Sequence, residues 1–219
     1  GGTKIEGILI NDKGEEILRK RSGYEKNYES GVNTIKNLVE EFDKHTNSKN
    51  SVGVGIPGSS SKENGLIKNA NSIWLNGKPF KKDLETNLDR EIKIMNDANC
   101  FALSEAIDGS GANYSTVWGV IIGSGFGGSF VHNKRVVEGV NQVAGDWGHQ
   151  PLPYPRKEEW DLNLKCPVDN CGRPLCAEQF ISGIGFTNIF NKKYKTNFTT
   201  KEIVDVELNG DERAKTEVD

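Results

Sequence analysis

Hydrophobic residues in the first part of the chain alternate between the spacing of strands and that of helices. Residues 4–10 and 15–20 are predicted to form two β-strands, joined by a turn whose last residue, Gly14, accepts a positive φ at little cost. Apolar side chains then recur every three or four residues, which predicts an amphipathic helix over residues 28–45. A short β-branched strand is expected at residues 51–56, followed by Pro57-Gly58.

The same alternation continues along the rest of the chain and predicts the α/β class, with strands and helices in layers. A polar loop and an irregular stretch cover most of residues 59–79, and residues 148–178 are also predicted to be mostly loop. The remaining expected elements are a helix around Leu84 and Leu88, strands at 92–95, 116–122 and 129–132, and helices at 99–107, 180–189 and 201–219.

Composition narrows the class of protein. A chain of 219 residues holds one large or two small domains. Its 28 basic and 31 acidic residues form no dense basic face, which argues against nucleic acid as the main partner. No apolar run approaches the roughly 20 residues of a membrane span. The chain starts without Met, and it contains no signal-peptide pattern. We therefore expect a cytoplasmic protein.

Three of the four cysteines, Cys166, Cys171 and Cys176, follow His149 at five-residue intervals. Thiolate and imidazole are the ligands that Zn²⁺ prefers, and one His with three Cys completes a closed structural tetrahedron. A small disulfide or free buried thiols are the alternatives, because the spacing matches no standard zinc-finger pattern. Clustered cysteines in a cytoplasmic protein favour the metal over a disulfide scaffold.

A carboxylate follows the strand predicted at residues 92–95, in the sequence Asn96-Asp97-Ala98-Asn99. The carboxyl end of a strand is where α/β folds place ligands, and an Asp there can accept a proton from a substrate hydroxyl. The alternative is structural, since Asp and Asn are among the best helix N-caps.

Glycine-rich segments supply two further candidates. An apolar strand runs into Gly123-Ser124-Gly125, where backbone N–H groups can approach a phosphate, although glycine turns also occur for conformational reasons alone. The sequence Gly1-Gly2-Thr3-Lys4 is a weaker signal of the same kind. In Gly145-Asp146-Trp147-Gly148-His149, Asp146 and His149 are close enough to face one pocket. A hydrogen-bonded imidazole and a packed Trp147 are the structural alternative.

Taken in order, these motifs resemble the ROK family of sugar kinases and sugar-responsive repressors, part of the actin-like ATPase superfamily. The resemblance covers essentially the whole chain, and its longer strings look most like bacterial fructokinases, while residues 99–106 look equally like N-acetylglucosamine kinases. It is carried by Gly1-Gly2-Thr3-Lys4, Gly55-Ile56-Pro57-Gly58, Asn96-Asp97-Ala98-Asn99, Ile122-Gly123-Ser124-Gly125, Gly145-Asp146-Trp147-Gly148-His149 and Cys171-Gly172 through Cys176 and Glu178.

The resemblance implies an actin-like ATPase (ribonuclease H-like) fold, with mixed sheets, flanking helices and two lobes around a cleft. It also implies ATP-dependent phosphorylation of a hexose, most simply fructose, with Mg²⁺ and with Asp97 as general base. The other matching positions are, for the sugar, Gly58, Asn96, Asp146, His149 and Glu178; for phosphate, Gly2, Thr3, Lys4, Gly123, Ser124 and Gly125; and for structural zinc, His149, Cys166, Cys171 and Cys176.

The chain departs from the family pattern at several positions. Asp146 stands where the family usually has Glu, Ser124 stands where Thr is usual, and Cys166-x₄-Cys171 replaces a Cys-x-Cys pair. The Asp that normally precedes Gly1-Gly2 and the segment that completes the adenosine pocket are absent. The expected lobes are therefore residues 1–96, without their first residues, and residues 97–219, incomplete at the C-terminus.

Other functions stay open from the sequence. A sugar-sensing repressor of the same family needs an upstream DNA-binding module, and the intact Asn96-Asp97 pair favours the kinase. A kinase for N-acetylhexosamine or glucose is a second alternative, and a zinc-stabilised interaction domain without activity is a third. Family members are often homodimers, so we expect one here.

Overall fold

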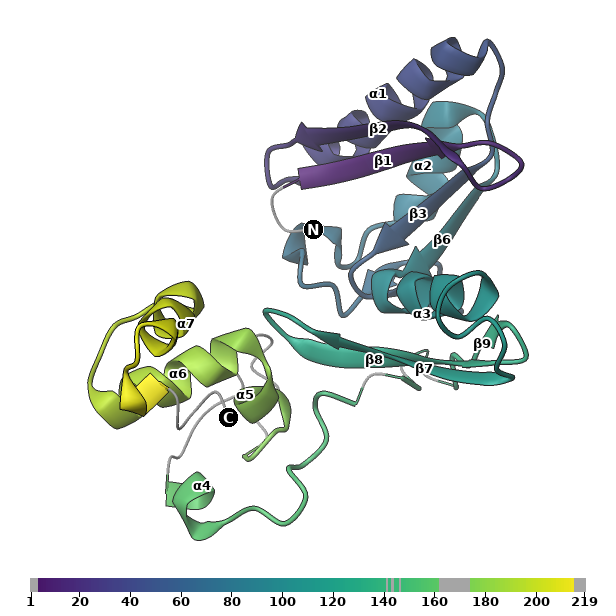
Figure 1. The fold of residues 1–219 in the computed structure, drawn as a ribbon. Helices are drawn as coiled ribbons and strands as arrows, with labels where there is room; N and C mark the ends of the chain where they lie inside the picture. The colour runs from purple at the N-terminus through teal and green to yellow at the C-terminus, as the bar shows by residue number, and fades with distance from the viewer. Residues whose placement is uncertain (1–3, 141, 143, 146, 162–173, 215–219) are drawn as a thin grey trace. The chain divides into compact units, whose positions relative to one another are not determined.

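The computed structural model describes residues 4–140, 142, 144–145, 147–161 and 174–214 (Figure 1). The chain divides into two compact units, residues 1–100 and residues 101–219, and each is described by itself. Strands and helices alternate along both, as the hydrophobic spacing predicted. The functional lobes expected at residues 1–96 and 97–219 stay a prediction.

The first unit contains three short two-stranded sheets. Strand β1 pairs antiparallel with β2, β3 pairs parallel with β6, and β4 pairs antiparallel with β5. The bounds are β1 Lys4–Ile10, β2 Glu16–Gly23, α1 Tyr28–Thr46, β3 Val52–Ile56, β4 Ser59–Ser60, β5 Ile67–Lys68, the 3₁₀ turn η1 Ile73–Leu75, α2 Phe80–Leu88 and β6 Ile92–Asn96.

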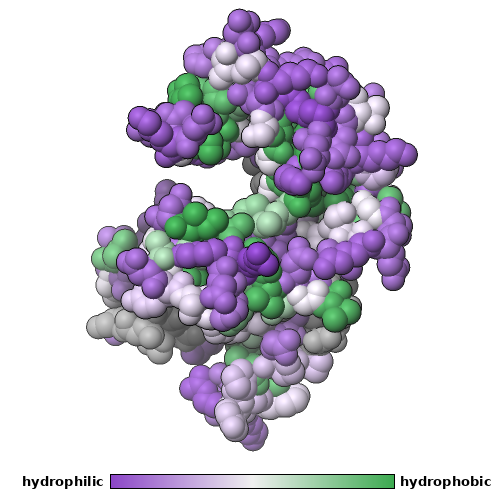
Figure 2. All heavy atoms as spheres, turned by 90° about the vertical axis from the view of Figure 1, so that its right-hand side faces the viewer, coloured by the Kyte–Doolittle hydropathy of each residue, from purple (hydrophilic) through white to green (hydrophobic). Residues whose placement is uncertain are grey.

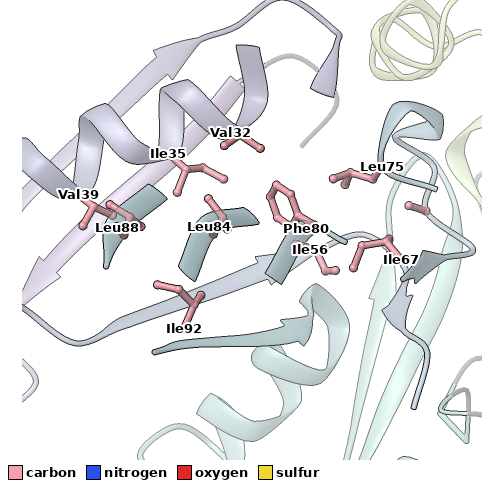
Figure 3. Packing of buried hydrophobic residues seen from close by; sticks show 11 residues of the cluster. Val32, Ile35, Val39, Ile56, Ile67, Leu75, Phe80, Leu84, Leu88 and Ile92 are labelled. Carbon is pink, nitrogen blue, oxygen red and sulfur yellow. The ribbon is translucent and has the colours of Figure 1, made fainter. Parts of the chain in front are cut away.

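Helix α1 begins and ends where its sequence supplies caps. The Asn27 side chain accepts a hydrogen bond from the Ser30 N–H at 2.8 Å, and Asn47 ends the helix in the left-handed region with φ 52°. Between these caps, the apolar positions share one face, which is buried. That face packs on α2, β3 and β6 (Figure 3), through Val32, Ile35, Val39, Ile56, Phe80, Leu84, Leu88 and Ile92.

One ion pair ties α1 to the segment between α2 and β6. The guanidinium of Arg90 donates to both carboxylate oxygens of Asp43, and Asn50 donates its backbone N–H to Asp43 Oδ1 at 2.9 Å. Both charged side chains are largely buried, with 12% and 17% of the Arg90 and Asp43 side chains exposed. These hydrogen bonds, that with Arg90 foremost, lower the pKa of Asp43 to about 2.

The second unit is built on an antiparallel sheet in the order β7-β8-β9, with α3 against it. A small cluster of Ala102, Ala106 and Val131 forms this contact, and Gly119 lies so close to Ala102 that a Cβ there would come within 2.7 Å. The bounds are α3 Asp97–Ile107, β7 Thr116–Ile122, β8 Phe126–His132, β9 Arg135–Val136, α4 Lys157–Asp161, α5 Glu178–Ile181, α6 Gly183–Tyr194 and α7 Thr200–Leu208.

Several boundaries differ from the sequence predictions. Helix α3 begins at Asp97 rather than at residue 99, because Asn96 supplies the capping side chain. Strand β8 begins at Phe126 rather than at residue 129, and β4 and β5 form inside the stretch predicted to be irregular. The helix predicted at residues 180–189 is divided at Ser182, whose hydroxyl caps α6 by accepting from the Gly185 N–H. Helix α7 ends at Leu208, and residues 215–219 lie outside the described part.

Polar residues cover most of the face in Figure 2, with apolar side chains among them. The exposed apolar residues include four on β7, namely Trp118, Val120, Ile121 and Ile122. Among the described residues, no helix is both long enough and apolar enough to cross a membrane.

We predict that Asp43→Asn lowers the free energy of unfolding by about 3 kcal/mol, because it leaves the buried Arg90 charge without its partner. The pKa of Asp43 is lower in the folded state than in the unfolded chain. Its stabilisation is therefore complete above about pH 4 and is lost as the pH falls towards 2. Denaturant unfolding between pH 7 and 2 measures both effects. Asp12→Asn, the same change at an exposed turn, should leave the unfolding free energy within about 0.5 kcal/mol.

Candidate functional site

The carboxyl ends of β3 and β6 bring two predicted sugar-binding residues together. The two strands are parallel neighbours, and Ile56 lies opposite Asn96 in their register. Gly58 follows two residues after Ile56, and the Asn96 side-chain amide donates to the Gly58 carbonyl at 3.0 Å. Residues at adjacent carboxyl ends of parallel strands are where α/β folds form ligand sites. Gly58 and Asn96, both expected to bind the sugar, are therefore joined by a direct hydrogen bond, and their role in sugar binding stays a prediction.

Only glycine fits at position 58. Its φ is +84°, and an added Cβ would lie 2.5 Å from the Lys68 carbonyl oxygen and 2.7 Å from the Ala70 nitrogen. The facing backbone is fixed in turn by Asn76, whose side chain accepts from the Ala70 N–H at 2.9 Å and donates to the Ala70 carbonyl at 3.0 Å. The loop after β3 is thus in backbone contact with the segment that follows β5. The two hydrogen bonds of the Asn76 side-chain amide to Ala70 fix that segment.

The structure separates the two explanations of the Asn96-Asp97 pair. Asn96 is the residue that caps α3, because its Oδ1 accepts from the Asn99 N–H at 3.2 Å while its amide nitrogen binds Gly58. Asp97 is the first residue of the helix, and its carboxylate is exposed. Within the described residues, that carboxylate accepts one hydrogen bond, from the neighbouring Ala98 N–H at 2.9 Å. A carboxylate in this position can reach a ligand without giving up the helix cap.

A half-buried thiol, Cys100, lies three residues after Asp97. Burial raises the pKa of the Cys100 thiol, and the negative charge of Asp97 adds to that rise. Cys100 Sγ would lie 3.5 Å from a Cβ at Gly55, so the thiol packs against β3. Cys100 is therefore a neutral, half-buried packing residue.

In the second unit, the glycine turn at residues 123–125 connects β7 to β8. Gly123 donates to the Gly125 carbonyl at 2.9 Å, and the Gly123 carbonyl accepts from the Gly183 N–H at 2.8 Å. Gly123 and Ser124 are exposed, so ligands can reach their backbone. Because Gly183 opens α6, the turn lies against the N-terminus of a helix, where the backbone dipoles favour an anion.

A short ladder brings His149, Cys176 and Glu178 together. Residue 151 forms an antiparallel bridge with Cys176, and the Glu178 N–H donates to the Gly148 carbonyl at 2.8 Å. Glu178 is 4% exposed, and its Oε2 accepts from the Phe126 N–H at 2.9 Å, directly after the glycine turn. One buried carboxylate therefore connects the end of the glycine turn to the segment that carries His149.

Glycine again permits the close approach. A Cβ at Gly148 would lie 1.7 Å from the Phe126 carbonyl oxygen, and one at Gly145 would lie 2.4 Å from the Ser129 Cα. The segment that contains both glycines is therefore in contact with the backbone of β8. Between them, Trp147 packs edge-on against Phe126 with ring centroids 4.4 Å apart.

The described part of the predicted zinc site has suitable geometry. His149 Nδ1 lies 3.4 Å from Cys176 Sγ. Zn–N and Zn–S bonds of about 2.1 and 2.3 Å at a tetrahedral angle place these two atoms about 3.6 Å apart. The same distance suits a hydrogen bond from a metal-free thiol or imidazole. Within the described residues no group of three potential ligands occurs, but Cys166 and Cys171 lie outside those residues.

Of the remaining residues predicted to bind phosphate or sugar, the structure describes one and leaves three outside the described part. Lys4 is the exposed first residue of β1 and lies opposite Gly23. Gly2, Thr3 and Asp146 lie outside the described residues. Sequence reasoning missed Asn76 as the residue that fixes the Gly58 contact. An Asn before Gly77 in a polar stretch was the only signal, and it equally suits a turn.

Comparison with known proteins gives the family. A sequence profile described as the ROK family matches residues 1–219. The chain belongs to the ROK family. It is 36% identical over 220 residues to the N-acetyl-D-glucosamine kinase of Citrobacter koseri, covering 100% of this chain and 73% of that protein. It is 38% identical over 217 residues to the kinase of the same name from Haemophilus influenzae, covering 98% of this chain and 71% of that protein.

The fold is confirmed by a solved structure. The ROK hexokinase of Thermus thermophilus superposes with a TM-score of 0.82 at 23% identity, covering 100% of this chain and 70% of that chain. The ROK chain therefore has the actin-like ATPase fold that the resemblance implied, with mixed parallel and antiparallel pairing.

We predict that Gly148→Ala destabilises the second unit by more than about 3 kcal/mol, because the methyl group would overlap the Phe126 carbonyl and separate the segment from β8. Gly123→Ala is the matched control, since nothing lies within 4 Å of an added Cβ there. Thermal unfolding of both variants measures the difference. Equal melting temperatures would contradict the close contact.

Proposed function

We propose that this ROK-family sugar kinase phosphorylates N-acetylglucosamine, with Asp97 as its general base. The observation that carries the proposal is the division of roles at the end of β6. Asn96 caps the helix and holds Gly58, which leaves the exposed Asp97 carboxylate for a substrate. The names of the two relatives at 36% and 38% identity support the sugar.

The reaction requires the transfer of one proton. A sugar hydroxyl attacks the γ-phosphate of ATP, its proton passes to the Asp97 carboxylate, and the bond to the leaving ADP breaks. Such a transfer depends mostly on in-line positioning and on neutralisation of charge. Mg²⁺, when bound with ATP, supplies part of that neutralisation. An aspartate on the first turn of α3, held by the β6 end, is a rigid base for this step.

Sugar recognition is assigned to residues in both units. In the first, Gly58 and Asn96 lie at the strand ends beside Asp97. In the second, His149 and Glu178 lie on the paired segments described above, and Asp146 belongs to the same motif. The side chain of Asp146 is one methylene shorter than the usual Glu, so its hydrogen bond to a sugar hydroxyl would reach less far. This difference would affect the preference among N-acetylglucosamine, glucose and fructose.

Phosphate binding is assigned to the two glycine-rich turns. Gly123 and Ser124 are exposed, Gly125 is half-buried, and the turn that they form lies next to the N-terminus of α6, which favours an anion. Lys4 would contribute a positive charge at the start of β1, with Gly2 and Thr3 before it in sequence.

We also propose the structural zinc site. His149 and Cys176 have a suitable separation, and the closely spaced Cys166 and Cys171 would complete the four ligands. The metal would fix the loop that carries His149, leaving its second ring nitrogen available for a sugar hydroxyl. A homodimer, a cytoplasmic location and the repressor alternative remain predictions from the sequence.

We predict that Asp97→Asn lowers kcat by about 10²–10⁴-fold, because the amide cannot accept the proton. Sugar binding should change much less, since the side chain keeps its size. A coupled assay for ADP, with N-acetylglucosamine, glucose, mannose and fructose as substrates, measures activity, and calorimetry measures sugar binding. Asp108→Asn makes the same chemical change at an exposed site just after α3 and should leave kcat unaltered.

The same assay tests the sugar separately from the base. The highest kcat/KM is expected with N-acetylglucosamine. A higher value with fructose would contradict the sugar while leaving the base intact. Full activity of Asp97→Asn would contradict the base, and a chain that binds sugar without ATP-dependent turnover would favour the repressor.

We predict that Cys176→Ser loses bound zinc and weakens sugar affinity together, because the loop with His149 loses its anchor. Elemental analysis and sugar-dependent thermal stabilisation measure the two effects. Cys100→Ser removes a thiol that packs against β3 and should keep the metal. Unchanged sugar binding in a zinc-free Cys176→Ser chain would refute the coupling, and a metal-free wild type would refute the zinc site.

A further inference from the structure

One side chain closes the loop at residues 70–76, which contains η1. The Asn76 side chain accepts a hydrogen bond from the Ala70 N–H at 2.9 Å and donates one to the Ala70 carbonyl at 3.0 Å. Ala70 itself is 4% exposed. Because a buried backbone N–H or carbonyl that loses its partner is destabilising, the position of Ala70 depends on this side chain.

The middle of the same loop is held by other contacts. A Cβ at Gly31 would lie 2.7 Å from the indole ring of Trp74, so the indole packs directly on α1. The ring of Tyr24 lies edge-on to the same indole, with ring centroids 5.5 Å apart, and Leu75 is 2% exposed. These contacts do not use the Asn76 side chain. A change at Asn76 would therefore release Ala70 and leave the rest of the loop attached.

Ala70 is where the loop meets the candidate sugar site. Its nitrogen lies 2.7 Å from the point that a Gly58 Cβ would occupy, and Asn69 before it is in the left-handed region with φ 56°. The Gly58 carbonyl in turn accepts from the Asn96 side-chain amide at 3.0 Å. A continuous series of contacts therefore runs from Asn76 through Ala70 and Gly58 to Asn96.

The series ends on the atoms expected to bind the sugar and leaves the base aside. Asn96 binds Gly58 through its amide nitrogen, whereas it caps α3 through Oδ1, which accepts from the Asn99 N–H at 3.2 Å. Since the two contacts use different atoms, α3 and its first residue, Asp97, keep their cap when Gly58 shifts. A shift of Gly58 would instead change the direction of its carbonyl and of the Asn96 amide.

We propose that Asn76 is a positioning residue for sugar binding, which acts through Ala70 on Gly58 and Asn96. The inference rests on the proposed function, because that function assigns Gly58 and Asn96 to the sugar. Asn76 controls the affinity for the sugar, while the proton transfer to Asp97 and the binding of ATP do not depend on it. By linkage, a sugar that binds when Gly58 is held in place also protects the Ala70 N–H from exchange.

The test uses the whole 219-residue chain with Asn76→Asp, because a carboxylate has the same size but cannot donate to the Ala70 carbonyl. With the preferred one of the four sugars, the sugar KM should rise about tenfold, the size expected for one lost hydrogen bond. The kcat and the KM for ATP should each change less than about twofold. Asn87→Asp is the matched control on exposed α2, where the side chain donates to the Asp83 carbonyl at 2.7 Å, and should change none of these constants.

Two measurements separate positioning from stability. Asp43→Asn weakens the same unit outside the series of contacts and should leave the sugar KM unaltered. Amide hydrogen exchange at Ala70 should become about tenfold faster in Asn76→Asp, and saturating sugar should slow it in the wild type. If Asn76→Asp does not fold, the exchange at Ala70 in the wild type with and without sugar still decides, and equal rates would overturn the proposal.

The other outcomes are equally distinct. An unchanged sugar KM in folded Asn76→Asp, or a loss confined to kcat, would overturn this proposal while the activity of the wild type left the proposed function standing. An equal rise in sugar KM for Asp43→Asn would assign the effect to stability and would also overturn it. A wild-type chain that neither binds nor phosphorylates any of the four sugars would contradict the proposed function and this inference together.

Discussion

Close approach of one backbone to another, which glycine alone permits, is the constraint on which the candidate site residues of each unit depend. At Gly58 the loop after β3 touches the backbone of Lys68 and Ala70, and at Gly148 the segment before His149 touches that of Phe126. Neither contact leaves room for a Cβ. Each brings a polar loop within reach of a strand end and so determines where Asn96 and Glu178 must place their side chains.

Hydrogen bonds from side chains to the backbone fix the loops that the glycines bring close to the strands. Asn76 binds both the N–H and the carbonyl of Ala70, and Asn96 binds Gly58 while it caps α3. Glu178 accepts from Phe126 in the second unit. These interactions fix loops that no regular ladder covers, and the buried carboxylate is held by a donor rather than left unpaired. The same side chains therefore serve both the fold and the candidate site.

The order of strands and helices followed from hydrophobic spacing, because α1, β3 and β7 each have one consistent apolar pattern. The division at Ser182 and the two-residue strands β4 and β5 did not follow, since they depend on contacts between distant residues. From the sequence, Asp97 was equally well explained as a general base and as the N-cap of a helix. The structure shows that the Asn96 side chain takes the cap, and the role of Asp97 as base stays a proposal. Asn76 was missed because its partner, Ala70, has no chemical signal.

The β1–β2 hairpin is joined to the core of the first unit by few side chains. Its main core lies between α1, α2, β3 and β6, whereas β1 contributes Ile5 to the margin of that cluster and reaches α1 mainly through the contact of Gly7 with Phe42. An isolated two-stranded hairpin is only marginally stable in water. The contact of Gly7 with Phe42 therefore holds the β1–β2 hairpin, and with it Lys4 at the start of β1, against α1.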